Sequence, residues 1–360
     1  MPDSVRILLL ADSHIGFDLP TRPRVDRRRR GHDFLANYAA ALEPAFQGEV
    51  DIVVHGGDVF DRPSVPPTVA YQALDPLRRL AERGVPVFIV PGNHERSQIP
   101  HSRFVLHESV HVFDRPRTFV ADVRGVRIAF SGFPYERRSV RERFSTLLEE
   151  CEWRRHRVDV QVLCMHHCVE GATVGPSDFV FTTAMDVVRL RDIPIDCAAV
   201  LSGHIHRRQA ITADLHGRPL ATPVLYPGSI ERTSFAEMGE SKGFMVVHVG
   251  NDDGRARWDF RDLPARPMVR RELEAGGMTP NVMESSVREI VGTLPVDAVV
   301  SIRIVGDMTD EHWRTLSAAR LRTFVPPTMN LDITPADRFP PRVTGHVKHG
   351  DEQPEMALGA

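Results

Sequence analysis

The stretch VRILLLADSHIG (residues 5–16) decides the fold. Residues 5–11 are almost continuously apolar, which is typical of a strand buried on both faces of a parallel sheet. Asp12, Ser13 and His14 follow directly, so polar side chains begin where the predicted strand ends. In open α/β sheets, functional sites form beyond the carboxyl ends of the strands. The stretch therefore predicts an α/β fold with a site at this edge of the sheet.

The strand is followed by a regular alternation of helical and strand patterns. Helical spacing of apolar residues covers 34–46 and 67–83, and apolar runs cover 51–55 and 85–90. Together with the first strand this gives a βαβαβ order. Such an order predicts a parallel sheet with helices packed on it.

Further candidate ligands also stand just past the ends of apolar runs. They are Asp58 after 51–55, Asn93 and His94 after 85–90, His166 after 160–165, and His204 and His206 after 198–201. With Asp12 and His14, and leaving His94 aside, they form a mixed set of oxygen and nitrogen donors. This set suits Mn²⁺, Fe²⁺ or Zn²⁺ better than Mg²⁺ or Ca²⁺ alone. Seven ligands are too many for one ion, so we expect two divalent ions, bridged by Asp58.

Each of these motifs has a structural alternative when it is taken alone. Asn93 accepts the left-handed conformation of a simple turn. One of His204 and His206 fits equally well as a satisfied core histidine, because alternate residues of a strand face the same way. Five motifs in this order, each at a predicted strand end, are hard to obtain by chance. A shared metal site is therefore the preferred interpretation.

The remainder of the chain predicts a second, smaller domain. Strands are predicted at 117–121, 126–131, 158–165, 197–202, 207–213, 223–226 and 243–249, with a helix at 139–153. The polar segment 261–267 contains two prolines and indicates a domain boundary. Beyond it we predict strands at 268–274 and 298–305 and helices at 281–293 and 309–319. We therefore expect a catalytic domain over 1–265, a small α/β domain over 266–335 and a poorly ordered tail over 336–360.

Composition narrows the class of protein. The formal net charge of the 360 residues is -3, so any DNA contact must come from a local patch. Four scattered cysteines without a CxxC pair favour a reduced, cytoplasmic setting. We see no signal-peptide pattern and no apolar stretch near the ~20 residues needed to span a bilayer, so we expect no membrane association. The chain has no Walker-type loop, so we expect no ATP hydrolysis by this chain alone.

One basic patch is visible in the sequence. Arg27, Arg28, Arg29 and Arg30 form a run between the first motif and the first predicted helix. We expect this run at the rim of the site, where it would neutralise DNA phosphates without reading sequence. A solvated helix start is the alternative interpretation.

The motifs ADSHIG, GGDVFDR, PGNHE, MHH and SGHIH resemble those of the calcineurin-like metallophosphoesterase superfamily. Within it, the chain is most similar to the SbcD-type DNA repair nucleases. The similarity rests on GDVFD, on YPGSIERTSFAE (226–237) and on the small region after 266. The resemblance implies an α/β fold, a four-layer αββα sandwich with a small C-terminal α/β cap domain.

The resemblance also implies a role for each candidate residue. The first ion would be held by Asp12, His14, Asp58 and His206. The second would be held by Asp58, Asn93, His166 and His204. His94 would protonate the leaving oxygen or stabilise the transition state. Asp61 either orients His94 or caps a turn, and His167 is the alternative to its neighbour His166.

The function implied is a Mn²⁺-dependent DNA exonuclease and endonuclease in DNA repair. Such a protein would bind DNA, form a homodimer and act with an SbcC-type coiled-coil ATPase. The first alternative is a small-molecule phosphodiesterase, for example on cyclic nucleotides, against which the YPGS segment and the appended domain argue. The second is a DNA-binding scaffold without catalysis, against which the complete ligand set and His94 argue.

Overall fold

The computed structural model describes residues 4–19, 28–250 and 254–336. The chain divides into two compact units, Met1–Met268 and Val269–Ala360. All four cysteines are free and buried. Within the described residues, no helix is both long enough and apolar enough to cross a membrane.

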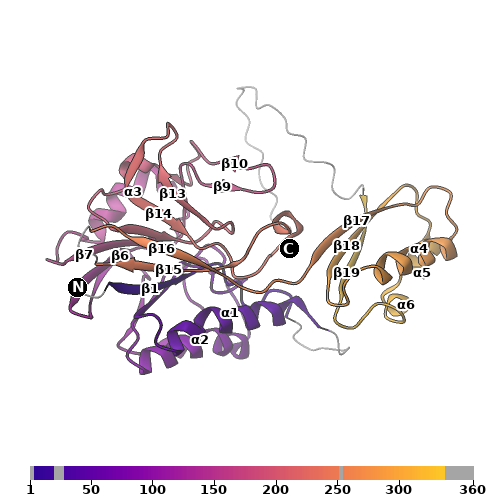
Figure 1. Cartoon of the computed structure of the whole chain (residues 1–360), viewed down its shortest axis with the longest axis horizontal. Helices are drawn as coiled ribbons and strands as arrows, with labels where there is room; N and C mark the ends of the chain where they lie inside the picture. The colour runs from indigo at the N-terminus through magenta and orange to yellow at the C-terminus, as the bar shows by residue number, and fades with distance from the viewer. Residues whose placement is uncertain (1–3, 20–27, 251–253, 337–360) are drawn as a thin grey trace. The chain divides into compact units, whose positions relative to one another are not determined.

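The first strand lies in the middle of a six-stranded sheet (Figure 1). In spatial order its strands are β16 (Arg257–Asp262), β15 (Gly243–Val249), β1 (Val5–Leu10), β2 (Ile52–His55), β3 (Val87–Ile89) and β4 (Val110–Val112). Strands β1 to β4 run parallel, as the βαβαβ pattern predicts. Strand β15 pairs antiparallel with β1, and β16 antiparallel with β15. Strands β4 and β16 were not expected from the sequence.

Two helices cover the outer face of this first sheet. They are α1 (Arg30–Phe46) and α2 (Pro67–Glu82), which also contact each other. Apolar residues of both helices, among them Phe34 and Leu77, share one core with Leu8 and Leu10 of β1. Helix α1 begins four residues before the predicted start. The carboxylate of Asp18 explains this, because it accepts a hydrogen bond from the Arg30 amide, which an isolated helix start leaves unsatisfied.

A second six-stranded sheet supplies the other half of the site. In spatial order its strands are β13 (Gln209–Ala213), β14 (Pro219–Tyr226), β12 (Ala199–Ser202), β7 (Val160–Met165), β6 (Val126–Gly132) and β5 (Arg117–Val123). Its four central strands run parallel and the two outer ones antiparallel. Helix α3 (Val140–Glu150) packs on its outer face, where Phe144 and Leu147 meet Leu163.

Short elements complete this unit. They are the strands β8 (Cys168–Val169), β9 (Thr173–Val174), β10 (Phe179–Val180) and β11 (Val187–Val188), and the 3-10 turns η1 (Ser102–Val105), η2 (Leu190–Asp192) and η3 (Phe235–Glu237). Strand β8 pairs with β11, and β9 pairs with β10. None of these short strands was expected, because two-residue strands carry no readable periodicity.

The two large sheets face each other across a continuous apolar layer. Ile7, Leu9 and Val54 of the first sheet belong to the same buried cluster as Phe130 and Val162 of the second. With α1 and α2 outside one sheet and α3 outside the other, the layers run helix, sheet, sheet, helix. The four-layer αββα sandwich expected from the sequence is therefore confirmed.

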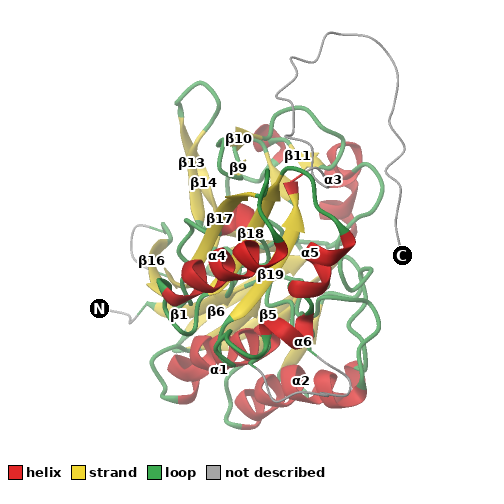
Figure 2. Cartoon of the chain, turned by 90° about the vertical axis from the view of Figure 1, so that its right-hand side faces the viewer, coloured by secondary structure: helices red, strands yellow, loops and turns green. Residues whose placement is uncertain are grey.

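The second unit is a small α/β structure. A three-stranded sheet has the order β17 (Met268–Glu274), β18 (Val299–Val305) and β19 (Asn330–Pro335). Helices α4 (Pro280–Gly292) and α5 (Asp310–Thr315) lie over one face of it, as Figure 2 shows, and a short helix α6 (Ala318–Leu321) follows. The single helix predicted at 309–319 is wrong, since α5 and α6 replace it. Strand β19 was not expected, and the predicted tail beyond Ala336 lies outside the described residues.

Candidate metal centre

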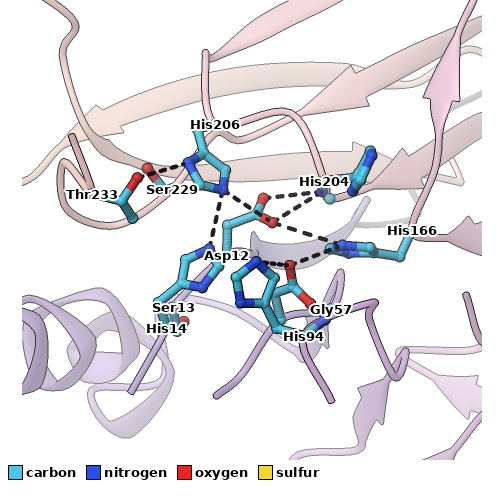
Figure 3. A network of polar contacts seen from close by, with 12 residues as sticks. Asp12, Ser13, His14, Gly57, His94, His166, His204, His206, Ser229 and Thr233 are labelled. Carbon is cyan, nitrogen blue, oxygen red and sulfur yellow. Dashed lines mark hydrogen bonds and ion pairs between the residues drawn. The ribbon is translucent and has the colours of Figure 1, made fainter. Parts of the chain in front are cut away.

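The seven predicted ligands meet where parallel strands of the two sheets end. Figure 3 shows five of them together: Asp12, His14, His166, His204 and His206. Strands β1, β2 and β3 deliver four of them from the first sheet, and β7 and β12 deliver three from the second. Both sheets present the carboxyl ends of parallel strands here. The ligands therefore span residues 12–206 in sequence yet share one small volume.

Four donor atoms form a tight group on one side of this volume. The Asn93 Oδ1 atom lies 2.9 Å from His204 Nδ1 and 3.0 Å from His166 Nε2. The Oδ2 atom of Asp58 lies 3.3 Å from the same His166 nitrogen. Ligands that each stand about 2.1 Å from one ion are separated by about 3 Å at right angles. The observed spacings therefore fit the edges of a metal coordination shell.

A second group of donors lies beside the first. The Nε2 atoms of His14 and His206 face each other at 3.0 Å. Asp12 is fully buried, and its Oδ1 atom is 4.0 Å from both His206 Nε2 and His166 Nε2. Two imidazole nitrogens and a carboxylate that converge in this way have the donor chemistry of a cation site. The residues thus compose a candidate dinuclear centre.

The main chain around the centre is held in an uncommon conformation. The φ angles of Asp12, His14, Asp58 and His204 are 50°, 42°, 52° and 83°. Non-glycine residues adopt such angles rarely, and they persist only where surrounding contacts hold them. Here the Asp12 amide donates to the Gly57 carbonyl at 2.9 Å, and the His14 amide donates to the Asp58 carbonyl at 3.0 Å. Hydrogen bonds between the loop after β1 and the loop after β2 therefore hold the strained conformation in place.

Two glycines allow these loops to approach. A Cβ atom on Gly57 would lie 2.1 Å from His166 Nδ1, and the φ of Gly57 is 109°. A Cβ atom on Gly92 would lie 2.1 Å from Asp58 Oδ1. No side chain can be accommodated at either distance without moving a predicted ligand. Both glycines are therefore required by the site and not only by a turn.

Comparison with known families explains the arrangement. The family model for calcineurin-like phosphoesterases matches residues 5–208, which contain all seven predicted ligands. The chain belongs to this family. It is accordingly a metal-dependent phosphoesterase.

Several relatives of this phosphoesterase are DNA repair proteins. It is 25% identical over 308 residues to the DNA double-strand break repair protein Mre11 of Aeropyrum pernix, covering 80% of this chain and 69% of that protein. It is 29% identical over 305 residues to the Mre11 protein of Haloferax volcanii, covering 84% and 62%. It is 27% identical over 301 residues to the SbcD component of the SbcCD nuclease of Bacillus subtilis, covering 76% and 73%. These relatives support the resemblance to SbcD-type nucleases.

One further histidine of the phosphoesterase faces the centre. The His94 side chain is 39% exposed, whereas that of Asp58 is 2% exposed. The Nε2 atom of His94 lies 4.0 Å from Asp58 Oδ2. Its Nδ1 atom lies 2.8 Å from the main-chain carbonyl oxygen of Asp61. A carbonyl only accepts, so Nδ1 carries the proton and Nε2 points to the site. Asp61 thus contacts His94 through its main chain, while its carboxylate lies 3.9 Å from His14 Nδ1.

The two adjacent histidines after β7 separate clearly. His166 donates from Nδ1 to the Gly56 carbonyl at 2.8 Å, which leaves the Nε2 lone pair facing the centre. His167 turns the other way. Its Nε2 atom accepts a hydrogen bond of 3.0 Å from the Glu136 amide, and its ring stacks on Tyr135. The geometry therefore favours His166 over His167 as a ligand.

Charges inside the centre are strongly coupled. Burial opposes ionisation of Asp58, but the neighbouring His166, with further contributions from His14, holds its pKa well below the usual range. Burial likewise opposes protonation of His166, yet Asp58 and Asp12 raise its pKa to about 9. Burial and the charge on His166 lower the pKa of His204 to about 3. At neutral pH the centre thus combines an ionised Asp58 and a neutral His204 with a protonated His166, which must lose a proton before it can bind a metal ion.

Sequence reasoning assigned no role to Glu95, the last residue of PGNHE. Its carboxylate accepts hydrogen bonds from the Gly92 amide at 2.7 Å and the Phe60 amide at 2.8 Å. It therefore ties the Asn93 loop to the Asp58 loop. Burial and the nearby Asp58 raise the pKa of Glu95 to about 8. The signal was present in the quoted motif, because a glutamate beside two ligand loops is a natural acceptor for their amides.

The arginine run is less uniform than predicted. Arg27 lies outside the described residues, and Arg28 and Arg29 are exposed. Arg28 pairs with Asp33, and Arg29 pairs with Asp18. Arg30 is buried, donates to the Arg232 carbonyl at 2.6 Å and lies 3.4 Å from Glu231. The expectation of an exposed, DNA-facing Arg30 is therefore wrong, because α1 starts at this residue and turns it into the fold.

Proposed function

We propose that this phosphoesterase is a DNA nuclease that hydrolyses phosphodiester bonds at the candidate metal centre. The observation that carries the proposal is the convergence of all seven metal-type ligands with an exposed, oriented His94 beside them. One relative named as a DNA double-strand break repair protein and another named as a subunit of the SbcCD nuclease support DNA as the substrate. The chain spans 69% and 62% of the first two of these relatives, so the activity of the whole proteins is carried over only as a proposal.

The ligands divide between two ions around Asp58. Asp12, His14 and His206 would hold the first ion, and Asn93, His166 and His204 would hold the second. We assign the Asp58 carboxylate to both ions, because it has an oxygen within 4.8 Å of a ring nitrogen of His14, from the first set, and of His166, from the second. Manganese is the metal we propose, with iron or zinc as alternatives. When bound, two such ions supply Lewis acidity to the phosphate and activate a water molecule.

His94 would then act on the departing oxygen. Its Nδ1 proton is engaged by the Asp61 carbonyl, so a second proton on Nε2 would be directed into the site. A 3′-alkoxide leaves poorly unless it is protonated or its charge is stabilised. The neighbouring Asn93 faces the ligand group instead, through its Oδ1 atom. In this proposal a metal ligand and a general acid are neighbours in the chain.

A substrate panel tests the proposal. The metal-depleted full chain would be reconstituted with Mn²⁺ and given linear double-stranded DNA, single-stranded DNA, a cyclic nucleotide, a chromogenic phosphodiester and a phosphomonoester. We expect hydrolysis of DNA and of the chromogenic diester, with Asp58→Ala as the inactive control. Preferential hydrolysis of the cyclic nucleotide would favour the small-molecule alternative. DNA binding without hydrolysis of any diester would favour the scaffold.

Two partners remain proposals. A homodimer is one, and the exposed side chains of Tyr71 (53%) and Leu106 (78%) are candidate contacts for it. Light scattering on the wild-type chain and on a Leu106→Asp variant would test this, and a monomeric wild type would contradict it. Assembly with an SbcC-type coiled-coil ATPase is the other, and it stays a prediction of the resemblance.

A further inference from the structure

Two residues outside the predicted ligand set, the buried Glu237 and the half-buried Thr233, contact the His206 ring. The Nδ1 atom of His206 lies 3.2 Å from the Oε1 atom of Glu237 and 3.3 Å from the Thr233 hydroxyl oxygen. Figure 3 shows His206 turned between Thr233 on one side and His14 and Asp12 on the other. An imidazole that donates Nδ1–H to a carboxylate presents a fixed and more basic Nε2 lone pair. That lone pair faces His14 at 3.0 Å.

Lys242 holds this carboxylate in place. Its side chain is fully buried, and its ammonium lies 2.7 Å from Glu237 Oε2, 2.9 Å from Glu240 Oε2 and 2.8 Å from the His206 carbonyl oxygen. An ammonium has three N–H donors, and here each has one acceptor. Lys242 therefore neutralises Glu237 and anchors the main chain of His206 at the same time.

The residue type at this position is informative. Lysine and arginine together number 45 in this chain, yet Lys242 and Lys348 are its only lysines. A planar guanidinium cannot replace a compact ammonium among three converging acceptors. In a chain that uses arginine almost throughout, a lysine at a fully buried position indicates that the geometry of this contact matters.

The other histidines of the centre have different partners. Within the described residues, the Nδ1 atoms of His166 and His94 donate to main-chain carbonyls, of Gly56 and Asp61. The Nδ1 atom of His14 is buried, and no described residue gives it a hydrogen bond. His206 alone among these four has a carboxylate within hydrogen-bonding distance of Nδ1. The first proposed metal site, which contains His206, therefore has a carboxylate behind one of its ligands. The Nδ1 partner of His166, in the second proposed site, is a main-chain carbonyl.

We infer that Glu237, held by Lys242, is a positioning residue that sets the metal affinity of the first half of the centre through His206. The inference rests on the ligand assignment made under the proposed function. The negative charge of Glu237 strengthens the His206 Nε2 donor, and the hydrogen bond fixes the plane of its ring. The second ion, whose proposed ligands do not include His206, should not depend on Glu237.

Titration of the metal-depleted full chain with Mn²⁺ tests this, with free Mn²⁺ followed by electron paramagnetic resonance. The wild type should bind two ions. Glu237→Gln keeps the shape of the side chain and removes its charge. It should weaken one ion about 10–100-fold, the usual effect of losing such a partner, and leave the other unchanged. The spectrum of the bound metal should change from a coupled pair to a single ion.

Glu240→Gln is the matched control. Glu240 also contacts Lys242, and it pairs with Arg207, but in the described part of the chain no hydrogen bond joins it to the His206 ring. The Glu240→Gln variant should bind both ions with wild-type affinity. Thermal unfolding of each variant without metal measures any general loss of stability. Equal weakening in Glu237→Gln and Glu240→Gln, or two unaltered ions in Glu237→Gln, would overturn the inference.

A second variant covers the case in which Glu237→Gln does not fold. Thr233→Val removes a hydroxyl that contacts both Glu237 and His206, with little change of shape. It should weaken the same ion, by less, and unchanged binding would again refute the inference. The proposed function is tested separately. A wild type that binds two Mn²⁺ ions but leaves DNA intact would refute that function and leave the role of Glu237 standing.

Discussion

The Nδ1 atom of His94 donates a hydrogen bond of 2.8 Å to the main-chain carbonyl of Asp61. The orientation of this histidine is therefore set by backbone, and it does not require a particular side chain at position 61. The carboxylate of Asp61 instead faces His14 at 3.9 Å. Substitution of the Asp61 side chain should therefore leave the orientation of His94 unchanged, so the roles of the two residues can be tested separately.

His94→Gln should retain both metal ions and lower the rate of DNA hydrolysis by about 10²–10⁴, the usual range for losing a general acid. The defect should shrink on a diester with a p-nitrophenolate leaving group, which needs little protonation. Asp61→Asn is the control and should leave this leaving-group dependence as in the wild type. Equal losses of His94→Gln on both substrates would rule out the acid role. Loss of metal would make His94 a ligand.

Asp58→Ala should release both ions, because we propose that its carboxylate bridges them. His206→Ala should weaken mainly one ion. Metal content after dialysis, measured by mass spectrometry on the wild type and both variants, distinguishes these outcomes. Near two ions per chain in Asp58→Ala would disprove the bridging assignment.

Gly57→Ala should distort the centre. The added Cβ would meet His166 Nδ1 at 2.1 Å, in addition to the strain of a φ of 109°. Gly48→Ala isolates the strain, since Gly48 has a φ of 75° and nothing within 4 Å of its Cβ position. We expect Gly48→Ala to cost about 1–2 kcal/mol and to bind metal normally. Gly57→Ala should unfold more easily and bind metal weakly, and equal behaviour of the two variants would show that the contact with His166 is unimportant.

Replacing Arg28 and Arg29 together by alanine should weaken DNA binding and reduce its salt dependence. The slope of the log binding constant against the log salt concentration should become less steep by roughly 0.9 for each phosphate that is no longer neutralised. Hydrolysis of a small diester should be unchanged. The exposed pair Arg154 and Arg155, replaced in the same way, controls for net charge. An unaltered salt slope would show that the run is only a solvated surface.

Arg30→Ala should instead destabilise the fold, because it leaves the buried Glu231 without this partner. Thermal unfolding of the metal-free chain measures the effect, with Arg29→Ala as the exposed neighbour for comparison. An equal unfolding temperature in the two variants would contradict a structural role for Arg30.

Much of the fold was readable because it depends on local pattern. Apolar runs of strand length and helical spacing predicted β1, α1, β2, α2 and β3. Edge strands such as β4, β16 and β19 were missed, since they are half exposed or exposed and carry no continuous apolar run. The helix predicted at 309–319 failed for a local reason. Thr309 caps α5, and the Thr315 hydroxyl bonds back to the His312 carbonyl where that helix ends.

The sequence by itself determined the chemistry of the centre: which residue types follow which strands, and hence a family of phosphoesterases. Those features are local, because a strand end and the polar residue after it are adjacent in the chain. Only the tertiary structure decided what lies around them. It turned His166 toward the centre and His167 away from it and buried Arg30. It also set the Asp61 carbonyl against His94 and brought Glu237 and Lys242 against His206. These contacts join segments far apart in sequence, and their partners are chosen by packing, which no local pattern records.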